Sequence, residues 1–267
     1  MLQINIENGK VHKAHNAVFV SLVGSQPRLT IEFVLYKGSS DSSKKAEGEL
    51  TVAKRLLEKM CQTYNRLVDI VVYDALACNS VWINHCINNK ITPVVHVKEN
   101  NISSIKEIKS KINKSKYKEE WQDLKRDCQV KAYEESFRME GVTDTLRFVK
   151  FSKKSPEGKY SQELVVTTDF NILLETLYKI MHKRWDIENS TFNKLKTYAG
   201  LDHCFVHHTN AIEAILHLMI TANNIIQLFV HRRLTGKAVK EMPEKELIRL
   251  IEKYMHTYKE KLVVDTC

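Results

Sequence analysis

The sequence lacks the short motifs that mark several common kinds of site. It contains no phosphate-binding P-loop, no GxGxxG fingerprint and no Ser, His and Asp in an order that indicates a hydrolase triad. The six cysteines are Cys61, Cys78, Cys86, Cys128, Cys204 and Cys267. They are scattered and form no CxxC pair, which argues against a disulfide framework or a structural zinc site and favours a reducing cytoplasm.

No secretory signal opens the chain, and no long apolar run is free of polar groups. The most apolar run, AIEAILHLMITANNIIQLFV at 211–230, contains Glu213, His217, Asn223, Asn224 and Gln227. These polar groups favour a buried core helix over a membrane span. We therefore expect a cytoplasmic protein without a membrane partner.

Length and charge narrow the class of protein. The 267 residues suffice for one elaborated domain or two small ones, and 43% hydrophobic with 27% charged residues is typical of a folded globular chain. The formal net charge of +9 favours a polyanionic partner, nucleic acid before membrane.

The hydrophobic patterns predict an α/β fold with a central mixed sheet flanked by helices. Strands are expected at 16–24 and 28–38 as a hairpin, and at 68–74 and 91–100, with helices at 49–64 and 81–88. The unbroken apolar run VDIVVYD predicts a central strand covered on both faces. After 100, a lysine-rich helix is expected at 102–125 and β structure at 130–168. Helices follow at 169–197, 209–234 and from 243 onward.

This order divides the chain into four parts. Residues 1–100 form the first part of the core, 101–168 a lysine-rich and then β-rich insertion, 169–235 a long helix and the core helix after it, and 236–267 a helical tail. The interleaving of helices with buried strands is what indicates an α/β layer.

The long helix at 169–197 has an unusual apolar face. On a helical wheel Arg184 and Glu188 lie near the middle of its apolar arc, where a carboxylate needs a partner because an unpaired buried ion is costly. The two side chains could pair with each other, one turn apart. Alternatively, Glu188 could bind a metal ion together with a second acid.

Asp74 is the best candidate for the second acid. It ends the apolar strand VDIVVYD, and ligands gather at the carboxyl ends of strands in α/β sheets. It could also simply cap the helix that follows. An acid at a strand end and an acid on a helix offer oxygen ligands that suit Mg²⁺ or Mn²⁺. With a basic chain, this favours phosphodiester chemistry on nucleic acid.

The segments VVYDALACNSVWINHCINNKITPVVHVKEN and RWDIENSTFNKLKTYAGLDHCFVHHTNAIEAILHLMITANNIIQLF resemble the DDE transposases of bacterial insertion sequences. The branch they resemble carries a Tyr-x2-Arg-x3-Glu-x6-Lys signature. The resemblance implies an RNase H-like core interrupted by a β-rich insertion, with Asp74 and Glu188 as the second and third catalytic acids. It further implies that Arg184 contacts DNA phosphates or orients the glutamate, and that two divalent ions activate the nucleophile.

The chain departs from that signature at several positions. Met181 stands where the tyrosine is expected, and Leu195 where the lysine is expected, with Lys196 one residue later. No aspartate precedes Asp41, which lies in a Ser- and Lys-rich loop, so the first catalytic aspartate is missing. We therefore expect an N-terminally truncated transposase with little or no activity alone. Alternatives are a non-catalytic DNA-binding remnant that inhibits transposition and a plain metal-dependent nuclease.

The sequence also indicates which other residues could contact DNA. The lysines of 106–118 line DNA or form a solvated face, and Trp121 is the tryptophan expected to contact DNA, whereas Trp82 and Trp185 are expected in the core. The stretch LDHCFVHH favours a loop packed beside the long helix over a zinc site. DNA is the predicted partner, and a homodimer is expected in the complex of two transposon ends.

Overall fold

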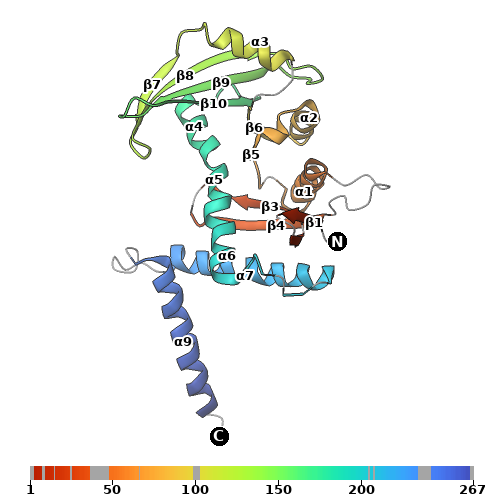
Figure 1. Cartoon of the computed structure of the whole chain (residues 1–267), viewed down its shortest axis with the longest axis vertical. Coiled ribbons are helices and arrows are strands. Elements are labelled where there is room, and N and C mark those ends of the chain that lie inside the picture. The colour runs from red at the N-terminus through yellow and green to blue at the C-terminus, as the bar shows by residue number, and fades with distance from the viewer. Residues whose placement is uncertain are drawn as a thin grey trace.

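A six-stranded mixed sheet forms the centre of the fold (Figure 1). The computed structural model describes residues 3–7, 10–14, 16–24, 26–36, 48–65, 67–98, 103–203, 205–206, 208–233 and 242–264. In the order β5-β6-β10-β9-β8-β7, the strands are Ile70–Tyr73, Thr92–His96, Tyr160–Thr167, Leu146–Lys154, Cys128–Phe137 and Glu119–Asp123. Strands β5 and β6 are parallel and the other neighbours antiparallel. The predicted α/β class with a mixed sheet is confirmed.

Two expectations about this sheet are wrong. Strand β5 lies at the edge rather than the centre, with β6 as its neighbour and all four of its residues half-buried. The expected lysine-rich helix at 102–125 ends early, because α3 spans Ser103–Ile112 and β7 follows at Glu119–Asp123. The strands of the predicted insertion, β7 to β10, continue the same sheet as β5 and β6.

Two hairpins precede the sheet along the chain. The predicted hairpin is confirmed as β3 at Asn16–Leu22 and β4 at Leu29–Tyr36, which pair antiparallel. Strands β1 at Gln3–Glu7 and β2 at Lys10–Ala14 form another hairpin, which the pattern did not predict. Asp41 lies outside the described residues.

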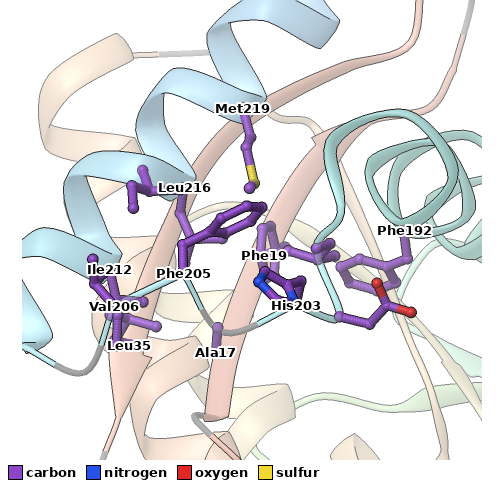
Figure 2. A pocket seen from close by; sticks show the side chains of 13 residues that line it. Ala17, Phe19, Leu35, Phe192, His203, Phe205, Val206, Ile212, Leu216 and Met219 are labelled. Carbon is purple, nitrogen blue, oxygen red and sulfur yellow. The ribbon is translucent and has the colours of Figure 1, made fainter.

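The hairpin β3–β4 carries a small apolar layer of its own. Phe33 of β4 packs with Leu195, Leu216 and Ile220 from the helices after residue 193. The rings of Phe19 and Phe192 meet edge to face with centroids 5.1 Å apart, beside an apolar cavity of about 400 Å³ (Figure 2). This layer holds the second half of the long helical region against the hairpin.

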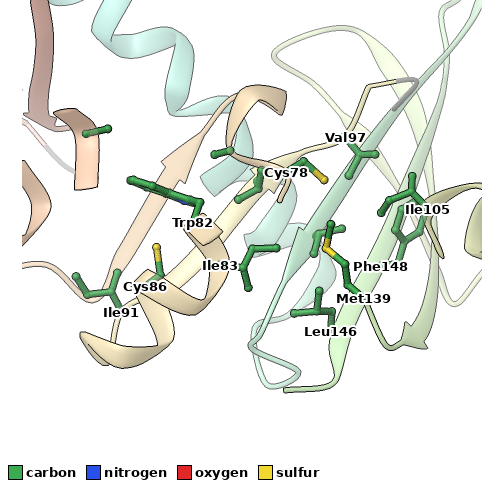
Figure 3. Packing of buried hydrophobic residues seen from close by; sticks show 14 of the residues in the cluster. Cys78, Trp82, Ile83, Cys86, Ile91, Val97, Ile105, Met139, Leu146 and Phe148 are labelled. Atoms are coloured by element: carbon green, nitrogen blue, oxygen red, sulfur yellow. The ribbon is translucent and has the colours of Figure 1, made fainter. Parts of the chain in front are cut away.

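Helices cover the six-stranded sheet on both faces. Helices α1 at Glu49–Tyr64, α2 at Ser80–Asn88 and α3 share one core with Val95 and Val166, part of which Figure 3 shows. Their sequence neighbours Val94 and Val165 belong to a second core, with helix α4 at Leu174–His182. Because successive strand residues point to opposite faces, the two cores lie on the two sides of the sheet.

The long helix predicted at 169–197 is interrupted in the structure. Helix α4 ends at His182, α5 spans Arg184–Ile187, a π-helical turn spans Glu188–Phe192, and α6 spans Asn193–Ala199. The predicted apolar arc holds over α4, where Leu174, Leu177, Tyr178 and Met181 are buried. Farther on it is only partly right, because Leu195 is buried whereas Trp185 is exposed.

Helix α7, at Thr209–Arg232, is not the buried core helix that its composition predicted. Of its most apolar window only 11% is buried, and the side of Leu218 and Ile225 faces outward. By length and composition alone, α7 could cross a membrane. It is tied to β4 instead, because Asn224 accepts a hydrogen bond from the Thr30 amide at 3.1 Å and donates one to the Thr30 carbonyl at 2.7 Å. Helix α9, at Glu244–Val264, extends away from the rest of the chain (Figure 1).

Candidate functional site

Asp74 directly follows β5 and lines a groove of about 700 Å³ at the end of the sheet. Its Oδ1 accepts a hydrogen bond from the Leu76 amide at 2.9 Å and caps the short 3₁₀ helix Ala75–Ala77. Asp74 therefore caps the helical turn that follows it, which is one of the two roles that the sequence indicated for this residue. One carboxylate oxygen is engaged by the cap, and the other, Oδ2, has no hydrogen bond within the described residues.

Arg184 and Glu188 form an ion pair beside this groove. The guanidinium Nη1 lies 3.0 Å from Glu188 Oε1, and the two side chains are 22% and 42% exposed. The expectation that both lie on a buried face is wrong, because the sheet ends here and the helix runs past its edge. The pairing of the two residues, one of the alternatives, is what the structure contains. The guanidinium also stacks over the Trp185 ring, 4.4 Å from its centroid.

Glu188 begins the π-helical turn Glu188–Phe192. Single π turns inside α-helices are rare, and those that do occur are often found at functional sites. In a regular α-helix, the residue seven positions on would lie on nearly the same side as Glu188. A π turn contains one extra residue, so Lys196 takes that place, and Leu195 is buried against the β3–β4 hairpin. The offset that made Lys196 a poor match in the sequence is thereby accounted for.

The groove brings together parts of the chain that are far apart in sequence. Asp74 from β5, His96 from β6 and Arg184 from α5 all line it. Tyr73 pairs with Val95, so continuing the parallel register sets Asp74 beside His96. Glu188 is not among the lining residues but is joined to the groove wall through Arg184.

A buried ionic cluster supports the same wall. Glu163 of β10 accepts a hydrogen bond from Lys153 Nζ at 2.7 Å and lies 3.2 Å from His182 Nε2. Although burial opposes its charge, hydrogen bonds from His182 and Lys153 lower the pKa of Glu163 to about 2. His182 also has Nδ1 2.8 Å from the Tyr178 carbonyl oxygen. Both ring nitrogens of His182 thus lie near oxygen atoms, one from a side chain and one from the backbone.

His96 lies at the other side of that cluster. Burial lowers the pKa of its imidazole, and its Nε2 lies 3.4 Å from the carbonyl oxygen of Met181. The sequence reasoning missed His96, Glu163 and His182. The available signal for His96 was a polar residue at the end of the strand that pairs with β5. Glu163 lies in the middle of β10 and His182 at the end of α4, so these two become recognisable only when the strand order and the packing of α4 are known.

Of the three tryptophans, Trp185 is placed differently from expectation. Trp121 lies on β7, is half-buried and packs its ring edge to face on Phe151 and Tyr178, and its contact with DNA stays a prediction. Trp185, expected in the core, is 48% exposed and lines the groove. Trp82 is buried as predicted.

The loop after α6 packs beside the helix as expected. His203 and Phe205 line the apolar cavity next to Phe192 (Figure 2). Cys204 and His207 lie outside the described residues.

The donor set fits a single hydrated divalent ion better than a pair of ions. Asp74 and Glu188 each have one carboxylate oxygen engaged, by the Leu76 amide and by Arg184. Mg²⁺ commonly keeps several waters and takes only one or two protein carboxylates. In the described ranges, no group of three Asp, Glu, His or Cys side chains is arranged to hold a metal ion.

Comparison with known proteins identifies a family and a similar solved structure. The family model for the transposase DDE domain matches residues 33–225. A solved piggyBac transposase synaptic complex with hairpin DNA is similar over 85% of this chain at 12% sequence identity, with a TM-score of 0.46. The aligned chain spans 43% of that transposase's length. No curated protein matches the sequence.

Proposed function

This chain belongs to the transposase DDE domain family, and from that premise we propose that Asp74 and Glu188 are two of its metal-binding catalytic carboxylates. The substrate is DNA at the ends of an insertion sequence, and the reaction is phosphodiester cleavage followed by strand transfer. The observation that carries this proposal is the groove, which joins Asp74 at a strand end to the Arg184–Glu188 pair on a helix.

Each residue has a role that follows from its chemistry. The free oxygens of Asp74 and Glu188 would hold Mg²⁺ or Mn²⁺, which lowers the pKa of bound water and polarises the scissile phosphate. Arg184 donates to Glu188 and, with its remaining N–H groups, reaches a DNA phosphate. Lys196, returned by the π turn to the side of Glu188, supplies a second phosphate contact.

We further propose that the chain is related to the bacterial insertion-sequence transposases that carry the Tyr-Arg-Glu-Lys signature. At the tyrosine position Met181 is fully buried in the core with Leu177 and Tyr178, so that position serves packing in this chain. The arginine, the glutamate and the displaced lysine are present. We place the chain in the cytoplasm, with DNA as its partner, no membrane contact, and a homodimer at the paired ends.

The number of carboxylates in the site determines the activity that we expect. Two carboxylates do not hold two metal ions as three do, so the chain alone is a weak or inactive transposase. The same observation favours a second function, a DNA-binding remnant that occupies transposon ends and inhibits transposition.

The first experiment measures metal binding without requiring turnover. Mn²⁺ titration followed by electron paramagnetic resonance should show a weak site that Asp74→Asn or Glu188→Gln each weakens by about tenfold or more. Glu175→Gln, an acid in a surface pair on α4 with Lys179, is the matched control and should bind as the parent does. Mn²⁺ binding that survives both site variants overturns the assignment.

The second experiment measures cleavage. Nicking and strand transfer on DNA that carries the ends of the encoding element should be weak or absent in Mg²⁺ or Mn²⁺. Robust activity that Glu188→Ala abolishes would overturn the weak-activity proposal while supporting the site. Cleavage without preference for the ends would instead favour a plain nuclease.

A further inference from the structure

Besides Asp74 and Arg184, several hydrogen-bond donors line the groove. Lys98 follows β6, Lys109 and Asn113 belong to the end of α3, and Gln162 lies on β10. Lys109 Nζ donates to the Lys98 carbonyl at 3.3 Å, which keeps its ammonium near the groove mouth. Of the lysine-rich run at 106–118, only Lys109 lines the groove.

A buried lysine orients the asparagine of this wall. Lys150 on β9 is 7% exposed, and its Nζ donates to Asn113 Oδ1 at 3.0 Å while standing 4.0 Å from the centroid of the Tyr133 ring. Burial lowers the pKa of this ammonium. Within the described ranges no carboxylate pairs with it. Because an ammonium can only donate, the Asn113 oxygen is engaged and the amide nitrogen, with its two N–H groups, is left for a ligand.

The charges along the groove are unequal. Asp74 and the Arg184–Glu188 pair lie at one end, where a metal-assisted reaction would need carboxylates. The other lining acid, Glu163, accepts a hydrogen bond from Lys153 Nζ at 2.7 Å and lies 3.2 Å from His182 Nε2. Lys98, Lys109 and the Asn113 amide nitrogen are donors, and donors from lysine and amide side chains are what DNA phosphates accept from proteins.

We propose that Lys98, Lys109 and Asn113 form a subsite for the backbone phosphates of the DNA strand that flanks the scissile phosphate, with Lys150 holding Asn113 in the binding orientation. This inference rests on the proposed function and adds the path that the DNA strand takes along the groove. The strand runs along the groove from the Asp74 end to the α3 end. Lys150 is a positioning residue, because it acts through Asn113 rather than on DNA.

The first test uses the salt dependence of DNA binding in the full chain, with EDTA present so that metal plays no part. The probe is a fluorescein-labelled 30-base-pair duplex. The Lys98→Ala/Lys109→Ala double variant should reduce the slope of log K against log salt by about 1.8, since each lost phosphate contact removes about 0.9. Lys125→Ala/Lys159→Ala removes the same charge outside the groove and should leave the slope unchanged. Equal slopes for the two doubles overturn the subsite.

The second test separates binding from a structural role. Asn113→Asp replaces the amide by a carboxylate of the same shape, which would pair with Lys150 and repel phosphate. DNA affinity should fall by about tenfold or more, while the urea midpoint of unfolding should not fall. Gln122→Glu, on β7 outside the groove, adds the same charge and should leave affinity nearly unchanged. Affinity for Asn113→Asp equal to that of Gln122→Glu contradicts the proposal.

The outcomes are distinguishable from failure of the proposed function. Mn²⁺ binding and nicking depend on Asp74 and Glu188, whereas the subsite is measured without metal. If Asp74→Asn and Glu188→Gln weaken Mn²⁺ binding but the lysine and asparagine variants bind DNA as the parent does, only the subsite is wrong.

Discussion

Helix α4 and the helical stretch that follows it are one apolar pattern in the sequence but two different environments in the molecule. In α4, Leu174, Leu177, Tyr178 and Met181 are buried against the sheet. In the next stretch, Arg184 and Trp185 line the groove, Glu188 pairs with Arg184, and the helix changes to a π turn. The first stretch anchors the helix and the second presents chemical groups, because the sheet beneath ends between them.

The strongest way to test this difference is to remove packing from the anchoring half. Leu177→Ala should lower the free energy of unfolding by about 2–5 kcal/mol, because its side chain is fully buried and a cavity would remain. Leu173→Ala, one turn earlier and 69% exposed, is the matched control and should change it by less than about 0.5 kcal/mol. The measurement is urea unfolding followed by circular dichroism. Similar losses in both variants would contradict the anchoring role of α4.

The junction of the two halves should be sensitive to acid through Glu163. Its folded pKa of about 2 lies below the ordinary value of 4.5. The stabilisation is therefore complete above pH 4.5 and is lost as the pH falls toward 2, and it amounts to about 3 kcal/mol or less. Glu163→Gln should remove this part of the pH dependence and lower stability at pH 7.

The measurement is the free energy of unfolding between pH 2 and pH 7. Glu175→Gln, which removes an exposed partner of Lys179, should keep the parent's profile. An unchanged acid profile in Glu163→Gln would show that the cluster around His182 does not hold the end of α4.

Substitutions at Trp121 and Trp185 compare a packed ring with an exposed one. Trp185→Ala should weaken binding of a single-stranded DNA probe by about 1–3 kcal/mol, because base stacking needs an exposed ring. It should change stability by less than about 1 kcal/mol. Trp121→Ala should do the reverse, lowering stability by about 3 kcal/mol with little effect on DNA binding. Fluorescence anisotropy and urea unfolding measure the two quantities, and the opposite assignment of effects would overturn the comparison.

The smallest expected effect on stability is at the Arg184–Glu188 pair. Its partners are one turn apart and partly exposed, so Glu188→Ala should change the free energy of unfolding by about 0.5 kcal/mol or less. A loss above about 2 kcal/mol would mean that Glu188 is a structural residue, in conflict with its proposed role in metal binding. The same variant serves in the cleavage assay, so one protein gives both answers.

Local patterns alone predicted much of the fold. The β3–β4 hairpin, helices α1 and α2, strand β6 and the buried residues of α4 follow from periodicity and turn residues, which act over a few positions. Asp74 and Glu188 remain predictions as catalytic acids, although the sequence alone pointed to a site containing both. The family likewise came from local motifs, the RW-x-IEN block above all.

The order of the strands, the end of the sheet and the π turn depended on tertiary structure. An apolar strand such as β5 has the same sequence at a centre as at an edge, and only its neighbours decide which it is. Arg184 is partly exposed and Trp185 is exposed, and a helical wheel does not contain the tertiary contacts that decide this. The π turn adds one residue between Glu188 and Lys196, which the sequence pattern did not indicate. His96 and Glu163 line the groove because strand pairing, a long-range interaction, set them beside residues far away in the chain. Asn113, just after α3, is held there by Lys150 of β9.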